Sequence, residues 1–233
     1  MNNIDKLIEQ NRAWSSEINK VNPTFFRNSA KNHNPSYFWI GCSDSRVSPN
    51  EILGVLPGQV FVHRNIANIV KNSDYNLLAA LHYSVEALKV SDILLCGHYG
   101  CGGIEAACQN KHFGAPLDNW LKTIKNIIAK HKDFLNMMQQ YRDVLVNQNI
   151  QHNQGKYAIF CEINLVHQVL SLADTMVVQN SWSQGRRVTI HPLIYEMSTG
   201  ILKQIFPSIS SNDELKNFYK QSLFLIEKKF SGK

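Results

Sequence analysis

The chain has 233 residues, five cysteines and a formal net charge of +6. This length suffices for one large domain with a buried core. No apolar run approaches the roughly 18 residues of a membrane span, and the first residues lack the pattern that is typical of a signal peptide. The odd cysteine count argues against a disulfide framework and for free thiols in a reducing compartment such as the cytoplasm, while the scattered basic residues predict a solvated surface and not a nucleic-acid interface.

Two helices are expected at the amino terminus. The spacing of Ile4, Leu7, Ile8 and Trp14 predicts an amphipathic helix over residues 4–20. A second helix is expected over residues 24–31. Residues 1–35 therefore form a helical arm, and its apolar stripe can pack either on the core or on a partner subunit.

The first expected strand covers residues 37–41, where aromatic and β-branched side chains predict a strand that is buried on both faces. A polar loop follows. A short helix is then expected to begin at Pro49, with Ser48 as its cap and Glu51 completing a capping box.

Strands and helices alternate along the rest of the chain, which predicts a parallel sheet. Further strands are expected at residues 59–64, 93–96, 188–195 and, at the sheet edge, 201–206. Helices are expected at residues 75–88, 104–109, 117–150, 157–180 (one long or two abutting) and 213–228. The expected fold is an α/β domain over residues 1–233, with a mostly parallel sheet of four strands plus a fifth edge strand in residues 36–206 and a closing helix in residues 207–233.

The loop after the first strand carries a thiol, a carboxylate and a guanidinium. Cys42, Asp44 and Arg46 are two residues apart, so in extended chain they point to one side. Asp44 and Arg46 can then form a bidentate ion pair that keeps the carboxylate ionised. Chemistry at the carboxyl end of a strand is one interpretation, and a structural ion pair beside a core cysteine is the other.

A second set of ligand-type side chains follows the strand at residues 93–96. His98 and Cys101 have a spacing that can bind one metal ion, and Cys42 joins them if the two strands are neighbours. Two thiolates and an imidazole suit Zn²⁺ and leave a fourth position for water. Cys96 is an alternative fourth ligand, which would give a closed structural site.

The residues around this site suggest how it works. Zn²⁺ with two thiolates and a neutral imidazole is net neutral, so it acidifies bound water less than a site with three neutral ligands does. Asp44 can accept the proton of a zinc-bound hydroxide and aim the lone pair of that hydroxide at an electrophile, while Arg46 holds Asp44 charged and in place. The remaining histidines, His82, His112, His131, His152 and His167, are expected to be surface or packing residues.

The ordered set of motifs resembles the β-class carbonic anhydrases. The matching segments are Cys42-Ser43-Asp44-Ser45-Arg46, Val62-His63-Arg64-Asn65-Ile66-Ala67-Asn68 and His98-x-x-Cys101-Gly102-Gly103. The resemblance implies reversible hydration of CO₂ to bicarbonate and a proton by zinc-bound hydroxide. It also implies zinc ligands Cys42, His98 and Cys101, the catalytic pair Asp44 and Arg46, and a homodimer, or a tetramer of two dimers, in which the amino-terminal helices wrap the partner.

A narrower resemblance is to the bicarbonate-regulated bacterial subgroup of that family. Trp39, Arg64 and Tyr195 match positions that bind regulatory bicarbonate there. The resemblance implies that Asp44 can leave Arg46 and fill the fourth zinc position, which shuts the enzyme. The alternative is that the three residues serve packing and ion pairing.

His33 and Gly102 are the remaining candidates, both for binding substrate. His33 stands where family members often carry a glutamine that faces the active site, so the resemblance leaves it either a hydrogen-bond donor or proton relay, or a surface residue. Two other functions stay open: hydrolysis of CS₂ or COS by the same zinc centre, and a non-catalytic zinc protein with a closed Cys₃His site.

Overall fold

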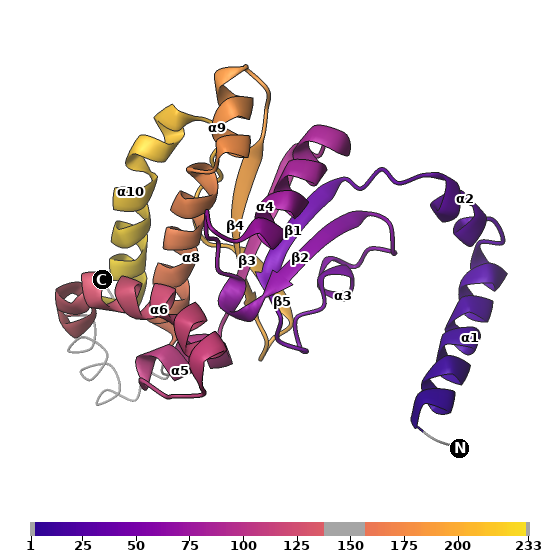
Figure 1. Cartoon of the computed structure of the whole chain (residues 1–233), viewed down its shortest axis with the longest axis horizontal. Coiled ribbons are helices and arrows are strands. Elements are labelled where there is room, and N and C mark those ends of the chain that lie inside the picture. Colours follow the sequence, from indigo (N-terminus) through magenta and orange to yellow (C-terminus); the bar gives the residue numbers. More distant parts are fainter. Residues whose placement is uncertain (1–2, 138–156, 232–233) are drawn as a thin grey trace.

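The computed structural model describes residues 3–137 and 157–231, and shows a central sheet flanked by helices, with an arm at the amino terminus (Figure 1). The α-helices are α1 (Asn3–Val21), α2 (Phe25–Lys31), α3 (Pro49–Leu53), α4 (Tyr75–His82), α5 (Gly102–Cys108), α6 (Ala115–Lys130), α8 (Ala158–Ala173), α9 (Met176–Ser183) and α10 (Asn212–Ser231). Among the described residues, no helix combines the length and the apolar character needed to cross a membrane.

The sheet confirms the predicted strands and their direction. Its strands are β1 (Tyr37–Cys42), β2 (Val60–Asn65), β3 (Asp92–His98), β4 (Thr189–Glu196) and β5 (Ile201–Gln204). They lie in the order β2-β1-β3-β4-β5, with β1 to β4 parallel and β5 antiparallel to β4 at the edge. The carboxyl ends of β1 and β3 are therefore adjacent, as the predicted metal site requires.

Both faces of the central strands are covered. Phe38 and Ile40 of β1 join the larger core, which is closed by α8 and, beside it, α10 (Figure 1). On the opposite face, Trp39 is buried in a smaller apolar group that we call the Trp39 cluster. Its buried members are Trp39, Val47, Leu94, Cys96 and Leu193. Because residues of one strand alternate between these two faces, the continuous apolar run of β1 is explained.

The amino-terminal arm stands apart from the rest of the molecule. Helices α1 and α2 have no buried residues and project away from the sheet (Figure 1). Within the arm, Trp14 packs edge-on against Phe26, with ring centroids 5.5 Å apart. The apolar side chains Ile4, Leu7 and Ile8 are exposed, so the stripe predicted from sequence is not covered within this chain.

Local details differ from the sequence expectations at three places. Ser48 occupies the cap position of α3, but its side chain makes no capping hydrogen bond, so the capping box is wrong. The helix that begins at Tyr75 continues from Tyr83 to Ala87 as a π-helical turn. The helix expected at residues 117–150 ends at Lys130, because the chain turns at His131. The segment expected at residues 157–180 is two helices, which is one of the two arrangements expected, with Thr175 as the cap of α9. Residues 138–150 of the helix expected at 117–150 lie outside the described residues.

Two of the histidines predicted to be surface or packing residues form a pair at the carboxyl end of α6 and on α8. The Nε2 atoms of His131 and His167 are 2.7 Å apart, so one ring donates a hydrogen bond to the other. Tyr219 of α10 packs against both rings. Burial lowers the pKa of both imidazoles, and burial together with the charges of His131 and Lys130 lowers the pKa of His167 to about 4.

This pair predicts a loss of stability in acid. Between about pH 6.5, where a free histidine titrates, and the lower value in the folded state, the unfolded chain binds a proton that the folded chain does not. The contribution of this pair to the free energy of unfolding is therefore complete above about pH 6.5 and is lost as the pH is lowered toward the folded-state pKa. We expect a loss of roughly 2 kcal/mol, discounted for partial exposure of His167. Urea unfolding of wild type and His167→Gln, above about pH 6.5 and again near pH 4, measures this loss of stability. Equal losses in the two proteins would show that His167 is not its source.

Candidate metal centre and active site

Three ligand-type side chains meet where β1 and β3 end. Cys42 is the last residue of β1, and His98 is the last residue of the neighbouring β3. Cys101 is the cap residue of α5, three residues further on. The Sγ atoms of Cys42 and Cys101 are 3.9 Å apart, and one ligand atom from each of the three residues lies within 4.8 Å of the others. The predicted convergence of Cys42, His98 and Cys101 is confirmed.

The His98 ring is oriented as a metal ligand would be. Its Nδ1 lies 3.0 Å from the carbonyl oxygen of Tyr99, so the proton sits on Nδ1 and is donated to that oxygen. Its Nε2 is buried and has no hydrogen-bond partner among the described residues. A buried nitrogen without a partner is costly, and a metal ion would satisfy it. The Cys₂His donor set therefore fits Zn²⁺.

The two thiols influence each other strongly because both are buried. A hydrogen bond from Cys101 lowers the pKa of Cys42 to about 4, and His98 adds to this effect against the opposing effect of burial. The resulting Cys42 thiolate raises the pKa of Cys101, and burial raises it further. The pair thus retains one proton in the metal-free protein, and a cation would displace it.

Asp44 and Arg46 form the predicted ion pair beside this cluster. Arg46 donates from Nε to Oδ1 at 2.9 Å and from Nη2 to Oδ2 at 2.7 Å. Its backbone N–H also donates to Oδ1. These hydrogen bonds hold the pKa of the Asp44 carboxyl well below its usual range, so the carboxylate is charged at every physiological pH.

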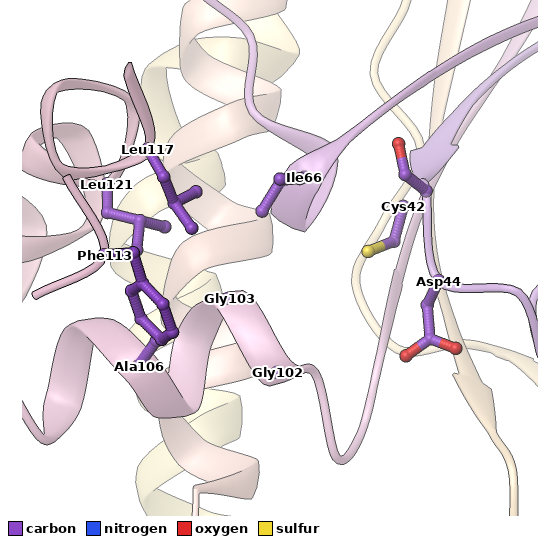
Figure 2. Close-up of a pocket in the computed structure, with 10 residues that line it drawn as sticks. Cys42, Asp44, Ile66, Gly102, Gly103, Ala106, Phe113, Leu117 and Leu121 are labelled. Carbon is purple, nitrogen blue, oxygen red and sulfur yellow. The ribbon is translucent and has the colours of Figure 1, made fainter. Parts of the chain in front are cut away.

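A pocket of about 360 Å³ opens beside Cys42 and Asp44. In Figure 2, Cys42 and Asp44 lie on one side of it, and the apolar side chains of Phe113, Leu117 and Leu121 lie on the other. A charged wall facing an apolar wall suits a small, uncharged, polarisable molecule. The apolar wall was missed by the sequence analysis, although the four-residue spacing of Leu117 and Leu121 is a signal for it.

The short 3₁₀ helix Ile66–Asn68 contributes Ile66 to the pocket wall and lies directly against Gly103. Ala67 and Asn68 both have left-handed backbone angles, with φ of 63° and 48°. A Cβ atom added at Gly103 would lie 2.9 Å from the Ile66 side chain and 3.2 Å from Ala67 Cβ, whereas one added at Gly102 would meet nothing within 4 Å. Gly103 therefore permits the close approach of α5 and this 3₁₀ helix.

This difference gives a matched pair of variants. Gly103→Ala should lower the free energy of unfolding by about 1–3 kcal/mol, because the 3₁₀ helix must shift. Gly102→Ala should leave it unchanged or raise it by about 0.5 kcal/mol, because alanine favours helix over glycine. Urea unfolding of both variants measures the difference, and equal stabilities would show that the 3₁₀ helix adjusts freely.

Trp39, Arg64 and Tyr195 lie on one face of the sheet, since Arg64 pairs with Gly41 and Tyr195 with His98 in the strand register. Tyr195 packs on the Trp39 cluster. Arg64 donates to the carbonyl oxygens of Cys42, at 2.8 Å, and of Asp44, at 2.5 Å. Arg64 therefore holds the backbone of the loop after β1, which carries Asp44 and Arg46, a contact that the sequence did not indicate.

The structure separates two other candidates from the cluster. His33 is exposed and precedes the amino end of β1, where its ring is 6.0 Å from that of Phe61. It does not line the pocket next to Cys42. Cys96 belongs to the Trp39 cluster on the other face of the sheet and is not a member of the metal group found among the described residues. All five cysteines are free.

Comparison with known proteins agrees with this geometry. Residues 37–202 match the family described as carbonic anhydrase. A carbonic anhydrase of Emericella nidulans is 36% identical over 208 residues, covering 88% of this chain and 86% of that protein. One from Saccharomyces cerevisiae is 31% identical over 204 residues, covering 87% of this chain and 89% of that protein.

Solved structures show the same fold. A tetrameric β-carbonic anhydrase from Sordaria macrospora superposes with a TM-score of 0.78 at 31% identity, covering 90% of this chain and all of that one. A Coccomyxa β-carbonic anhydrase in complex with acetazolamide superposes with a TM-score of 0.80 at 29% identity, covering 97% and 99% of the two chains. The family match, the extended identity and the shared fold agree with the Cys42, His98 and Cys101 cluster, and the chain therefore belongs to the β-class carbonic anhydrases.

Proposed function

We propose that the protein catalyses the reversible hydration of CO₂ to bicarbonate and a proton, with Zn²⁺ held by Cys42, His98 and Cys101. The observation that carries this proposal is the unpartnered, buried Nε2 of His98 beside two thiols at the mouth of an apolar-walled pocket. When bound there, Zn²⁺ supplies the Lewis acid that activates water for attack on CO₂. Membership of the carbonic anhydrase family supports the same reaction.

The residues of the chain have separate tasks in this reaction. The apolar wall of Phe113, Leu117 and Leu121 receives CO₂ and excludes competing water. The Asp44 carboxylate accepts a hydrogen bond from the attacking oxygen and turns its lone pair toward the carbon. Arg46 keeps Asp44 charged and fixed, so that this orientation is in place before the substrate arrives.

We also propose that the enzyme is a dimer or a pair of dimers. The uncovered apolar stripe of α1 supports packing of the arm on a partner, and a similar solved chain is described as tetrameric. Since His33 lies on a segment that leaves the body with this arm, it can serve substrate binding only in a partner's site. Size-exclusion chromatography with light scattering of wild type and Leu7→Ser measures the assembly, and an unchanged monomer in both would overturn it.

Regulation by bicarbonate is a third proposal. It rests on the buried Trp39, whose Nε1 has no hydrogen-bond partner among the described residues, and on Arg64, which links the same face to the carbonyl oxygen of Asp44. Bicarbonate that draws Arg64 away would release the catalytic loop and free Asp44 to occupy the fourth metal position. A steep pH–activity curve that becomes smooth in Arg64→Ala supports this proposal, and a smooth curve in both proteins overturns it.

Stopped-flow CO₂ hydration is the test of the main function. Zinc-loaded protein should hydrate CO₂ at a rate that rises between about pH 7 and about pH 9, as the activated water ionises. Stripping the metal with a chelator should abolish the reaction, and adding zinc back should restore it. Full zinc occupancy without hydration at any pH would overturn the proposal, and CS₂ and COS would then be assayed as substrates.

A further inference from the structure

A buried charge network connects the carboxy-terminal helix to the metal centre. Glu162 of α8 is only 1% exposed, and it accepts hydrogen bonds from the hydroxyl of Tyr99 and from Nζ of Lys229 on α10. Lys229 also donates to the Tyr99 hydroxyl at 2.6 Å. The three side chains thus form a closed triangle, which we call the Tyr99 triad, in which each member contacts both others.

Tyr99 is also the residue that orients the His98 ring. Its carbonyl oxygen accepts the Nδ1 hydrogen bond of His98, while its backbone N–H donates to Tyr195 at 3.2 Å. The chain then passes through Gly100, with φ of 68°, to Cys101. Tyr99 therefore lies in the two-residue segment that joins the proposed ligands His98 and Cys101, and its side chain fixes this segment to α8 and α10.

The triad is expensive to bury and takes no part in the reaction described above. Burying an ionised carboxylate is strongly unfavourable unless it is fully hydrogen-bonded and paired. Here the cost is met by Lys229, whose side chain is 32% exposed and reaches Glu162 from the edge of the molecule. Glu162 and Lys229 line a pocket of about 450 Å³ that is separate from the pocket beside Cys42.

We propose that Glu162 and Lys229 are positioning residues for the metal centre, which fix the Tyr99 carbonyl oxygen and the loop to Cys101 and thereby strengthen metal binding. This inference rests on the proposed zinc site. Partners of metal-bound histidines commonly change metal affinity by about 10- to 100-fold when they are altered. Helix α10 thus contributes to the metal centre although none of its residues is a ligand.

The experiment compares zinc affinity, by competition with a chelator, in wild type, Tyr99→Phe, Lys229→Met and Lys228→Met. Tyr99→Phe keeps the ring and removes only the hydroxyl, and Lys228→Met changes the adjacent lysine lining the same pocket. We expect the first two variants to bind zinc about tenfold more weakly and the third to bind like wild type. The Co²⁺-substituted proteins should show altered absorption bands in the first two variants only.

Two further readouts make the result decisive. The Tyr99→Phe/Lys229→Met double variant should lose little more affinity than either single variant, because both remove the same anchor. If Tyr99→Phe unfolds at a lower temperature without zinc but keeps wild-type zinc affinity and cobalt spectrum, the triad is only structural and the inference is wrong. If wild type itself binds no zinc, the proposed function fails as well, and that outcome is distinguishable from the previous one. If Lys229→Met does not fold, Tyr99→Phe alone decides.

Discussion

Cys42→Ser should leave the protein without tightly bound zinc and reduce CO₂ hydration by at least about a thousandfold. Serine is nearly the same size, but its hydroxyl stays protonated and is a poor ligand for zinc at neutral pH. The remaining His98 and Cys101 supply only two donors, too few to hold the metal in competition with solvent. Zinc content by mass spectrometry and stopped-flow hydration measure the two effects on the same sample.

Cys96→Ser is the matched control. Cys96 is a buried thiol on β3. It pairs in the strand register with Gly41, the residue before Cys42 on β1, but its side chain belongs to the Trp39 cluster. Its thiol donates to the carbonyl oxygen of Gly97, and burial raises its pKa well above the usual range, so it is a poor thiolate donor. Zinc content and activity should be retained in this variant. Loss of zinc in Cys96→Ser would instead support a closed four-ligand site and contradict the proposed open one.

Asp44→Asn should reduce kcat/KM for CO₂ hydration by about a hundredfold while the protein keeps its zinc. Asparagine has the same shape but is neutral, so it loses the charge-assisted hydrogen bonds from Arg46 and cannot accept at both terminal atoms. The attacking oxygen would then be oriented no better than by solvent. Parallel measurement of zinc content separates this effect from loss of the metal.

Arg46→Lys tests the geometry of the same pair. Lysine retains the positive charge but not the two parallel N–H groups, so the loss should be smaller than in Asp44→Asn. Because Asp44 is charged throughout the accessible pH range, neither variant should move the pH midpoint of the activity by protonation of this residue. Full activity in Asp44→Asn would show that the carboxylate has no catalytic role.

Local sequence patterns predicted most of the sheet correctly. The apolar runs at residues 37–41 and 93–96 form strands because each is long enough for a strand and is followed or ended by glycine and polar residues, and the sheet places the two side by side. The capping box at Ser48 failed because α3 has only five residues. In so short a helix the chain direction is set by contacts of Ile52 and Leu53 with the Trp39 cluster, and not by end capping.

The sequence by itself determined the donor atoms of the site. Cys42, Asp44, Arg46, His98 and Cys101 lie within two short loops after recognisable strands, and side-chain chemistry at such loops follows from residue type and spacing. Only one long-range contact, between β1 and β3, was needed to join them. Alternation of strands and helices predicts that these strands are parallel, but it does not predict that β1 and β3 are neighbours, and the fold decided that contact.

Only the tertiary structure decided what surrounds these donors. The apolar wall from Phe113 to Leu121, the Arg64 hydrogen bonds to the catalytic loop and the Tyr99 triad each join segments that are distant in sequence. The separation of His33 from the cluster also depends on where the arm leaves the body (Figure 1). Such contacts arise from the packing of whole helices and strands. Local periodicity shows which face of a helix is apolar, but it does not show which distant segment that face will meet.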